Sequence, residues 1–279
     1  MKKKEILLTV VILLTAAGFA QALEGELQGS IDLTYQSKYI WRGFDVYGDK
    51  SAIQPAIDLD LYGTGFGINI MAHRANSSVY ENAERWDYTL YYSNSAFDAE
   101  PYATNYRLSY VYYNYPDNTS HAAATGGTLS FDLQEINAMF SWPKICPFGI
   151  VPSYVLVKLW PSNSDSSVGG RSPSGGTASG WAHIFMLDYP LTVPGIMPDT
   201  PEQVLNLHTE MVYNDGVSPN GATNVDHDWS NFVLGISTDF NITDNFIFTP
   251  GVYHQITMDK SVNPDKDETW VNLGMKYKF

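Results

Sequence analysis

The last twelve residues of the chain alternate strictly between apolar and polar positions. Residues 268–279 read ETWVNLGMKYKF. One face carries Val271, Leu273, Met275, Tyr277 and Phe279, and the other carries Trp270, Asn272, Gly274, Lys276 and Lys278. A period of two predicts a β-strand with one dry face and one wet face.

Twelve segments of the chain alternate in this way or have the composition of strands. Each has about the length that a tilted strand needs to cross a bilayer, roughly 9–11 residues with some overhang. They are residues 28–38, 52–62, 65–74, 84–94, 104–115, 128–142, 150–160, 179–190, 203–214, 229–240, 245–256 and 268–279. Only a closed barrel satisfies the backbone of such a chain in a membrane. We therefore expect an all-β, antiparallel, up-and-down transmembrane barrel of about twelve strands, with ten or fourteen as alternatives.

The connections between these segments are alternately long and short. Residues 160–180 and 214–229 are rich in Gly, Ser and Asn, as surface loops are, whereas 62–65 and 240–245 are tight turns. Membrane barrels have long external loops and short periplasmic turns. The connection 189–203 contains four prolines and is long for a periplasmic turn. It is either an ordered periplasmic loop or a sign that the strand count is wrong there.

The N-terminus predicts export. Three lysines precede an apolar run over residues 6–17, and Ala20-Gln21-Ala22 supplies small residues for cleavage, so residues 1–22 form a predicted signal peptide and 23–279 the barrel domain. Cleavage would change the formal charge from −14 to −16, because three lysines and one glutamate are lost. This acidity argues against nucleic acid as a partner.

The single cysteine, Cys146, forms no internal disulfide and is expected to be an incidental free thiol in a turn.

The terminal strand resembles the C-terminal strand of bacterial outer-membrane barrels, in which the assembly machinery recognises a final Phe. Phe279 is preceded by apolar or aromatic residues at every second position. The resemblance implies an outer-membrane location, assembly by the barrel assembly machinery, and contact with outer-membrane lipid and lipopolysaccharide.

A second resemblance lies at the first strand and its loop. SKYIWRG, followed by GDKSAIQPAIDLDL, resembles the start of the Gcw_chp group of bacterial outer-membrane proteins. The matching positions are Ser37, Tyr39, Trp41, Arg42, Gly43, Gly48, Asp49, Ala52 and Gln54, whereas Ser51 replaces a common proline. The match covers about the first fifth of the mature chain. It implies fold and location, and it transfers no functional residue because the group has no established activity.

Parity assigns a polar set of residues to the inside of the barrel: Asp32, Gln36, Asp58, Asp60, Asn69, His73, Arg85, Asp87, Arg107, Glu135, Asn137, Lys158, Asp188, Asn206, His208, Glu210, Asp239, Lys276 and Lys278. A soluble barrel would show the reverse assignment. From this set we take Asp58, Asp60, Arg85, Asp87, Arg107, Glu135, Glu210, Lys276 and Lys278, together with Arg42, as candidates for the lumen or a constriction. A twelve-stranded ring is wide enough for a narrow aqueous lumen or for one filled by side chains.

Arg42 has two interpretations. It follows Tyr39 and Trp41, so it either belongs to an interfacial anchor and pairs with an inward carboxylate, or forms part of a solute-selecting constriction. Belts of aromatic residues are expected at both membrane–water interfaces. Six tryptophans fall at strand ends next to the predicted external loops: Trp41, Trp86, Trp160, Trp181, Trp229 and Trp270.

Two function classes follow. The first is a narrow channel for small hydrophilic solutes, with a preference for cations if the lumen is open. The second is a structural or interaction barrel with a plugged lumen and partner-binding loops. A soluble lipid or pigment binder is a more distant alternative.

Enzymatic and metal-binding roles have weaker support. A lipid-facing hydrolase would need a catalytic pair such as Ser230 and His254, which the sequence favours weakly. Loop residues could offer oxygen ligands to a divalent ion: Asp226, His227 and Asp228 in one loop, and Asp259, Asp265, Asp267 and Glu268 in another. Neither loop has the spacing of a known metal motif, so no catalytic, metal or cofactor residue is assigned.

Overall fold

The computed structural model describes residues 26–117, 119–121, 128–130, 132–162, 180–195, 201–216, 227–260, 262–263 and 266–279. The predicted signal peptide, residues 1–22, lies outside the described residues. No helix in the described ranges is long and apolar enough to cross a membrane.

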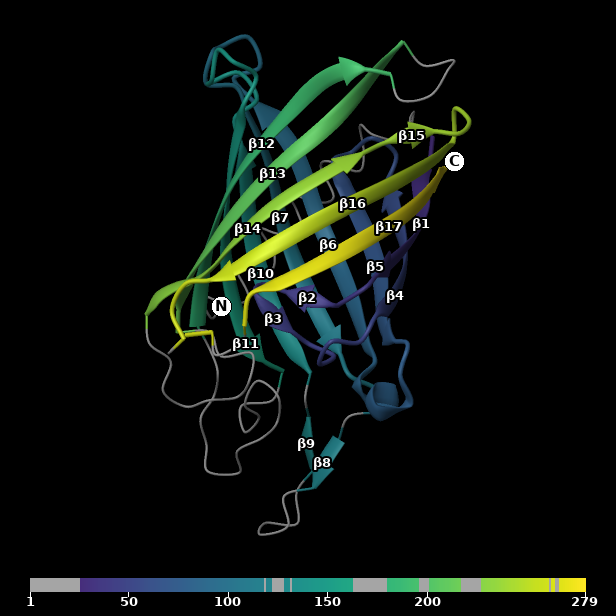
Figure 1. The fold of residues 1–279 in the computed structure, drawn as a ribbon, viewed down its shortest axis with the longest axis vertical. Coiled ribbons are helices and arrows are strands. Elements are labelled where there is room, and N and C mark those ends of the chain that lie inside the picture. Colours follow the sequence, from purple (N-terminus) through teal and green to yellow (C-terminus); the bar gives the residue numbers. More distant parts are fainter. Residues whose placement is uncertain are drawn as a thin grey trace, which may run out of the picture.

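Twelve long strands form one closed antiparallel barrel, which confirms the predicted fold class. The ring closes where the first strand pairs with the last, Asp32 facing Lys276. Figure 1 shows the barrel from the side. The strands are β1 (Gln28–Gln36), β4 (Ala52–Asp60), β5 (Phe66–Ala75), β6 (Arg85–Ala96), β7 (Thr104–Asn114), β10 (Leu133–Ser141), β11 (Val151–Pro161), β12 (Gly180–Pro194), β13 (Glu202–Asp215), β14 (Asp228–Thr238), β16 (Phe246–Thr257) and β17 (Glu268–Lys278).

Four short strands, a fifth that extends a turn, and one 3-10 helix lie in the described parts of the connections between the barrel strands. The two-residue strands β2 (Ile40–Trp41) and β3 (Phe44–Asp45) pair with each other, as do β8 (Thr119–His121) and β9 (Thr128–Ser130). The strand β15 (Phe240–Asn241) extends the β14–β16 turn, and the 3-10 helix η1 (Ser78–Ala83) lies between β5 and β6.

The two ends of the barrel differ, as the alternating connections predict. One end, here called the loop end, carries the connections 37–51, 76–84, 115–132, 162–179, 216–227 and 258–267. The other, called the turn end, carries 61–65, 97–103, 142–150, 195–201 and 239–245. The termini of β1 and β17 meet at the turn end, where Ser30 faces Lys278.

The proline-rich connection 189–203 is mostly strand. β12 continues to Pro194 and β13 begins at Glu202, with these two residues paired, so the strand count is unaffected. Prolines are tolerated there because the ends of this hairpin project beyond its neighbours and need fewer ladder hydrogen bonds. A smaller difference concerns segment 128–142, whose first residues form β9, so that the barrel strand begins only at Leu133.

The apolar faces of the strands point outward. Ile31, Leu90 and Ile136 are 53–54% exposed on different strands, whereas the inward residues Arg85 and Glu135 are 3% and 0% exposed. Large apolar side chains on the outside need a bilayer as their solvent. The soluble lipid or pigment binder is therefore wrong.

The predicted parity of β11 is also wrong. Val157 and Leu159 point inward and are fully buried, whereas Lys158 lies over the outward Trp181 ring, 5.2 Å from its centroid. The run VLVKLW is nearly continuous in apolar character, so its alternation could not be read from the sequence.

Candidate functional site in the barrel lumen

The loop between β1 and β4 folds into the barrel. This inserted segment, residues 37–51, contains the β2–β3 hairpin, in which Trp41 pairs with Phe44. Its two turn residues have positive φ angles, 50° at Arg42 and 93° at Gly43, as a type I′ turn requires. Figure 1 shows β2 and β3 within the outline of the barrel, in its loop-end half. The residues of the SKYIWRG motif thus build a hairpin rather than the end of a strand.

Arg42 at the hairpin tip pairs with an inward carboxylate. Its Nη2 lies 2.8 Å from Oε1 of Glu135 on β10. The second carboxylate oxygen of Glu135 accepts a hydrogen bond from the Tyr113 hydroxyl at 2.9 Å, and Asn137 donates to the first at 2.9 Å. Buried charges in proteins need such partners, because desolvation of an unpaired charge costs several kcal/mol, about 3–5 when one partner is removed.

Gly43 fixes the other side of the tip to β16 and the last loop. Its carbonyl accepts hydrogen bonds from Nε2 of Gln255 at 2.7 Å and from Nδ2 of Asn263 at 2.8 Å. A Cβ atom at this position would lie 2.3 Å from Oδ1 of Asn231 on β14. Only glycine combines this approach with the positive φ.

A second charge cluster lies beneath the hairpin on β5 and β6. Arg85 binds Asp87, with Nη2 to Oδ2 at 2.8 Å, and donates to the Tyr39 hydroxyl at 2.6 Å. His73 lies 2.9 Å from the same Asp87 oxygen. The Trp41 ring covers the Arg85 guanidinium, 4.6 Å from its centroid, which is a cation–π contact.

Lys38 and Asp49 anchor the base of the segment. Lys38 pairs with Asp49 at 2.5 Å and with the buried Glu268, and Lys266 pairs with Asp49 at 3.1 Å. Hydrogen bonds from Lys38 and Lys266 lower the pKa of Asp49, and the same contacts with Asp49 and Glu268 raise the pKa of Lys38. Burial raises the pKa of the neighbouring Asp45.

These base contacts bear on the predicted metal ligands. Ligand atoms of Asp45, Asp49 and Glu268 lie within 4.8 Å of one another, but Lys38 and Lys266 already supply the opposing charge. His227 pairs with Asp215, and Asp267 accepts from the backbone of Thr257. Asp226 and Asp265 lie outside the described residues.

The inserted segment fills the loop half of the barrel. Inward residues from eleven of the twelve strands are at most 7% exposed in this half: Ala52, His73, Arg85, Tyr113, Leu133, Val157, Ala182, Val212, Asn231, Gln255 and Trp270. Part of this layer is apolar, built by β7 and β10–β13. Of the candidate lumen residues, Arg42, Arg85, Asp87 and Glu135 meet here as paired groups.

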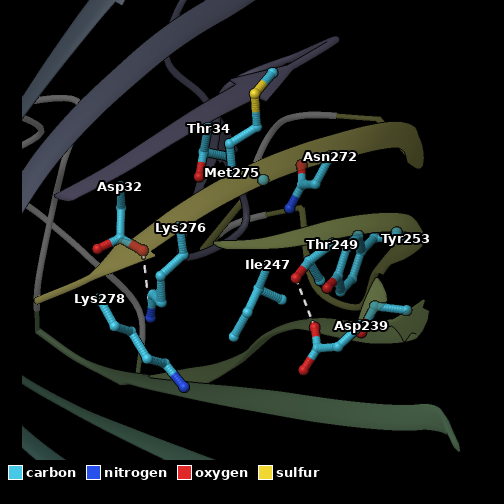
Figure 2. Close-up of a pocket in the computed structure, with 13 residues that line it drawn as sticks. Asp32, Thr34, Asp239, Ile247, Thr249, Tyr253, Asn272, Met275, Lys276 and Lys278 are labelled. Atoms are coloured by element: carbon cyan, nitrogen blue, oxygen red, sulfur yellow. Dashed lines mark hydrogen bonds and ion pairs between the residues drawn. The ribbon is translucent and has the colours of Figure 1, made fainter. Parts of the chain in front are cut away.

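The turn half of the lumen is polar and hollow. A cavity of 340 Å³ lies in it, and Lys276 is 3.2 Å from Asp32 at its edge. Figure 2 shows Lys276 and Lys278 extending into this cavity from β17. A separate cavity of 620 Å³, on β6, β7 and β10, is lined by Arg107, which donates to the Ser93 hydroxyl at 2.8 Å.

The remaining candidates have local partners. Asp58 accepts from the Tyr91 hydroxyl at 2.7 Å, and Asp60 accepts from the Gly63 amide at 2.7 Å in the turn. Glu210 faces Val233 in mid-barrel. Phe279 is 47% exposed on the outer surface, and its backbone exchanges two hydrogen bonds of 3.0 Å with Gly29.

Three expectations about individual side chains are wrong. Trp41 packs against Tyr113 inside the barrel, and Trp270 is 7% exposed and stacks on Tyr253, so neither belongs to a lipid-facing belt. Ser230 is buried, whereas His254 is exposed, pairs with Leu234 in the ladder and binds Thr269. The proposed Ser230–His254 pair is therefore not formed.

Several residues of this site had no signal in the sequence. Asn231, Gln255 and Asn263 contact the hairpin from distant positions in the sequence, and Tyr47 of the inserted segment donates to the His73 carbonyl on β5. The hairpin had a local signal that the interpretation as an interfacial anchor overlooked, since a glycine between Trp41 and Phe44 suits a two-residue turn.

No family model and no curated protein matches this chain. Among solved structures, the KdgM porin superimposes with a TM-score of 0.51 at 11% identity, covering 90% of this chain and 99% of that chain. The NanC porin gives a TM-score of 0.48 at 10% identity, covering 90% and 100%. The likeness to the KdgM porin is one of fold, a β-barrel matched over nearly its whole length. A closed barrel with an apolar outer belt places this chain in the bacterial outer membrane.

Proposed function

We propose that the protein is a narrow channel for small hydrophilic solutes, closed in its loop half by the inserted segment. The observation that carries this proposal is the polar cavity of the turn half, in a barrel whose loop half is filled by the inserted segment. A porin-like fold supports a non-enzymatic role. Because inward carboxylates such as Asp32, Asp58 and Asp239 outnumber the inward cations of the turn half, we expect a preference for cations. The loop end would face the outside.

The segment is suited to leave its closed position. The backbone amides of Val46 and Tyr47 donate within the segment, to the Tyr39 carbonyl and the Asp45 carboxylate, and the Gly43 carbonyl at the tip is held by barrel and loop side chains. Several buried atoms around the tip lack a hydrogen-bond partner in the described structure: Arg42 Nη1, both amide atoms of Asn231, Gln255 Oε1 and Thr257 Oγ1. Each such group costs roughly 1–3 kcal/mol, which lowers the free energy needed to release the hairpin.

Planar-bilayer recording tests this proposal. A variant in which residues 39–47 are replaced by a short Gly-Ser linker should conduct in long open events, whereas the wild-type protein should conduct rarely or at low level. Folding of the variant is checked by its heat-modifiable migration on a gel. A folded variant that never conducts, at any voltage or salt concentration, would contradict the channel proposal.

A second candidate is an interaction barrel with a plugged lumen. The filled loop half favours it, because a permanently docked segment would leave only the loops available for function. A non-conducting, folded linker variant would support this alternative. Recognition by the assembly machinery through Phe279, contact with lipopolysaccharide, and membership of the Gcw_chp group remain proposals under either function.

A further inference from the structure

The cavity in Figure 2 carries opposite charges on separate walls. We infer that it is a binding site for a small zwitterionic solute, one that bears both an ammonium and a carboxylate group. This inference rests on the proposed channel function and assigns a solute class to its turn half. Three features of the cavity support it.

The positive wall is formed by β17. Lys276 is held by Asp32 at 3.2 Å, but Lys278 has no ion pair among the described residues and its side chain is exposed. Figure 2 shows the Lys278 ammonium extending into the cavity beyond Lys276. An unpaired ammonium inside a barrel is a recognition group for an anion.

The negative wall lies beyond β16. Asp239 follows β14, and its Oδ1 accepts a hydrogen bond from the Thr249 hydroxyl at 2.5 Å, which orients the carboxylate toward the cavity (Figure 2). The backbones of β14 and β17 are two strand spacings apart, about 10 Å. No ion pair joins Asp239 to a cation in the part of the chain that the structure describes. Lys278 and Asp239 thus line the same cavity from strands on either side of β16.

Two inward glycines lie in the floor between these walls: a Cβ at Gly274 would meet nothing closer than 3.5 Å, whereas the Tyr253 ring covers Gly251. Gly251 and Gly274 occupy inward positions on β16 and β17, where Gly251 faces Asn272 and Gly274 faces Thr249. The cavity measures 340 Å³, near the lower end of the roughly 300–1,000 Å³ typical of small-molecule sites. The lining also includes the neutral hydrogen-bonding groups of Thr34 and Ser237 and the apolar side chain of Ile247. A simple anion would satisfy Lys278 and leave Asp239 unpaired, whereas a zwitterion satisfies both.

Equilibrium binding to the purified protein in detergent tests the site without requiring any current. Isothermal titration with L-glutamine should show binding, and acetate or ethylammonium, which each carry one of the two charges, should bind at least about tenfold more weakly, the effect of losing one charge-assisted contact. Lys278→Gln and Asp239→Asn should each weaken L-glutamine binding by a similar factor. Lys144→Gln, which removes a lysine at the turn end outside the cavity, should change nothing.

Three results would overturn the inference: no binding of L-glutamine, acetate binding as tight as that of L-glutamine, or unchanged L-glutamine affinity in either variant. Failure of the channel proposal would appear separately, as absence of conductance in the linker variant, because the titration measures binding alone.

Discussion

The loop half and the turn half of the lumen are enclosed by the same twelve strands, yet they use charge differently. In the loop half, the Arg42 and Glu135 side chains are 16% and 1% exposed, whereas in the turn half Lys276 and Asp32 are 46% and 23% exposed. The free energy needed to break the ion pair therefore differs between the two halves. A buried pair is costly to break because it leaves one charge without water, while a half-exposed pair contributes about 0–1 kcal/mol. The inserted segment buries the inward charges of the loop half, and their ion pairs therefore hold the segment in its docked position.

Breaking the buried pair is expected to have the largest effect. Glu135→Ala leaves Arg42 unpaired and should destabilise the docked segment by roughly 3–5 kcal/mol. Single-channel recording should show frequent opening, and protease should cleave within residues 37–51. The matched change in the turn half, Asp32→Ala, removes the partner of Lys276 and should leave both readouts unchanged. A double change, Arg42→Met with Glu135→Leu, should stay closed, since an apolar pair of similar volume replaces the ions. A closed Glu135→Ala variant would contradict the unequal energies of the two halves.

A smaller effect is expected from a methyl group at the hairpin tip. Gly43→Ala places a Cβ 2.3 Å from Asn231 at a φ of 93°, whereas Gly63→Ala, in a turn-end connection, meets nothing within 4 Å at a φ of 66°. Both changes impose backbone strain of about 1–3 kcal/mol. Only Gly43→Ala should also raise the open probability, because only Gly43 is packed against the barrel wall. Equal conductance of the two variants would show that the tip does not depend on this close contact.

The smallest effect is expected from acid at the base of the segment. Since the folded pKa of Asp49 is lowered by Lys38 and Lys266, its contribution to stability is complete above its unfolded pKa of about 3.9 and is lost as the pH falls through the folded value. Burial raises the pKa of the neighbouring Asp45, so protonation of Asp45 in acid favours the docked segment and partly offsets the loss at Asp49. Pepsin cleavage of the segment, divided at each pH by the cleavage of an unstructured peptide because pepsin is more active in acid, should increase from pH 5 to pH 2. Asp49→Asn should abolish that increase relative to its own value at pH 5; an identical pH profile in the variant would count against the base contacts.

Much of the barrel could be predicted from residue patterns, because period-two alternation records which face of a strand meets lipid. The failures occurred where alternation was lost. In β11 a continuous apolar run concealed the parity of Lys158, and in the inserted segment the rings of Tyr39 and Trp41 looked like interfacial anchors. An aromatic ring suits the inside of a packed barrel as well as a membrane interface, so residue type alone does not distinguish the two places.

The sequence by itself determined that this chain crosses a membrane as a β-barrel of about twelve strands with unequal loops, since local alternation and turn residues are read one strand at a time. Only the tertiary structure decided what fills the barrel. Arg42 meets Glu135, 93 residues away, and Gly43 meets Gln255, 212 residues away. Such contacts depend on how the ring closes and where a loop folds, and no local pattern of side chains encodes that choice. The separation of a locked half from a hollow half is therefore a property of the closed ring and not of any single strand.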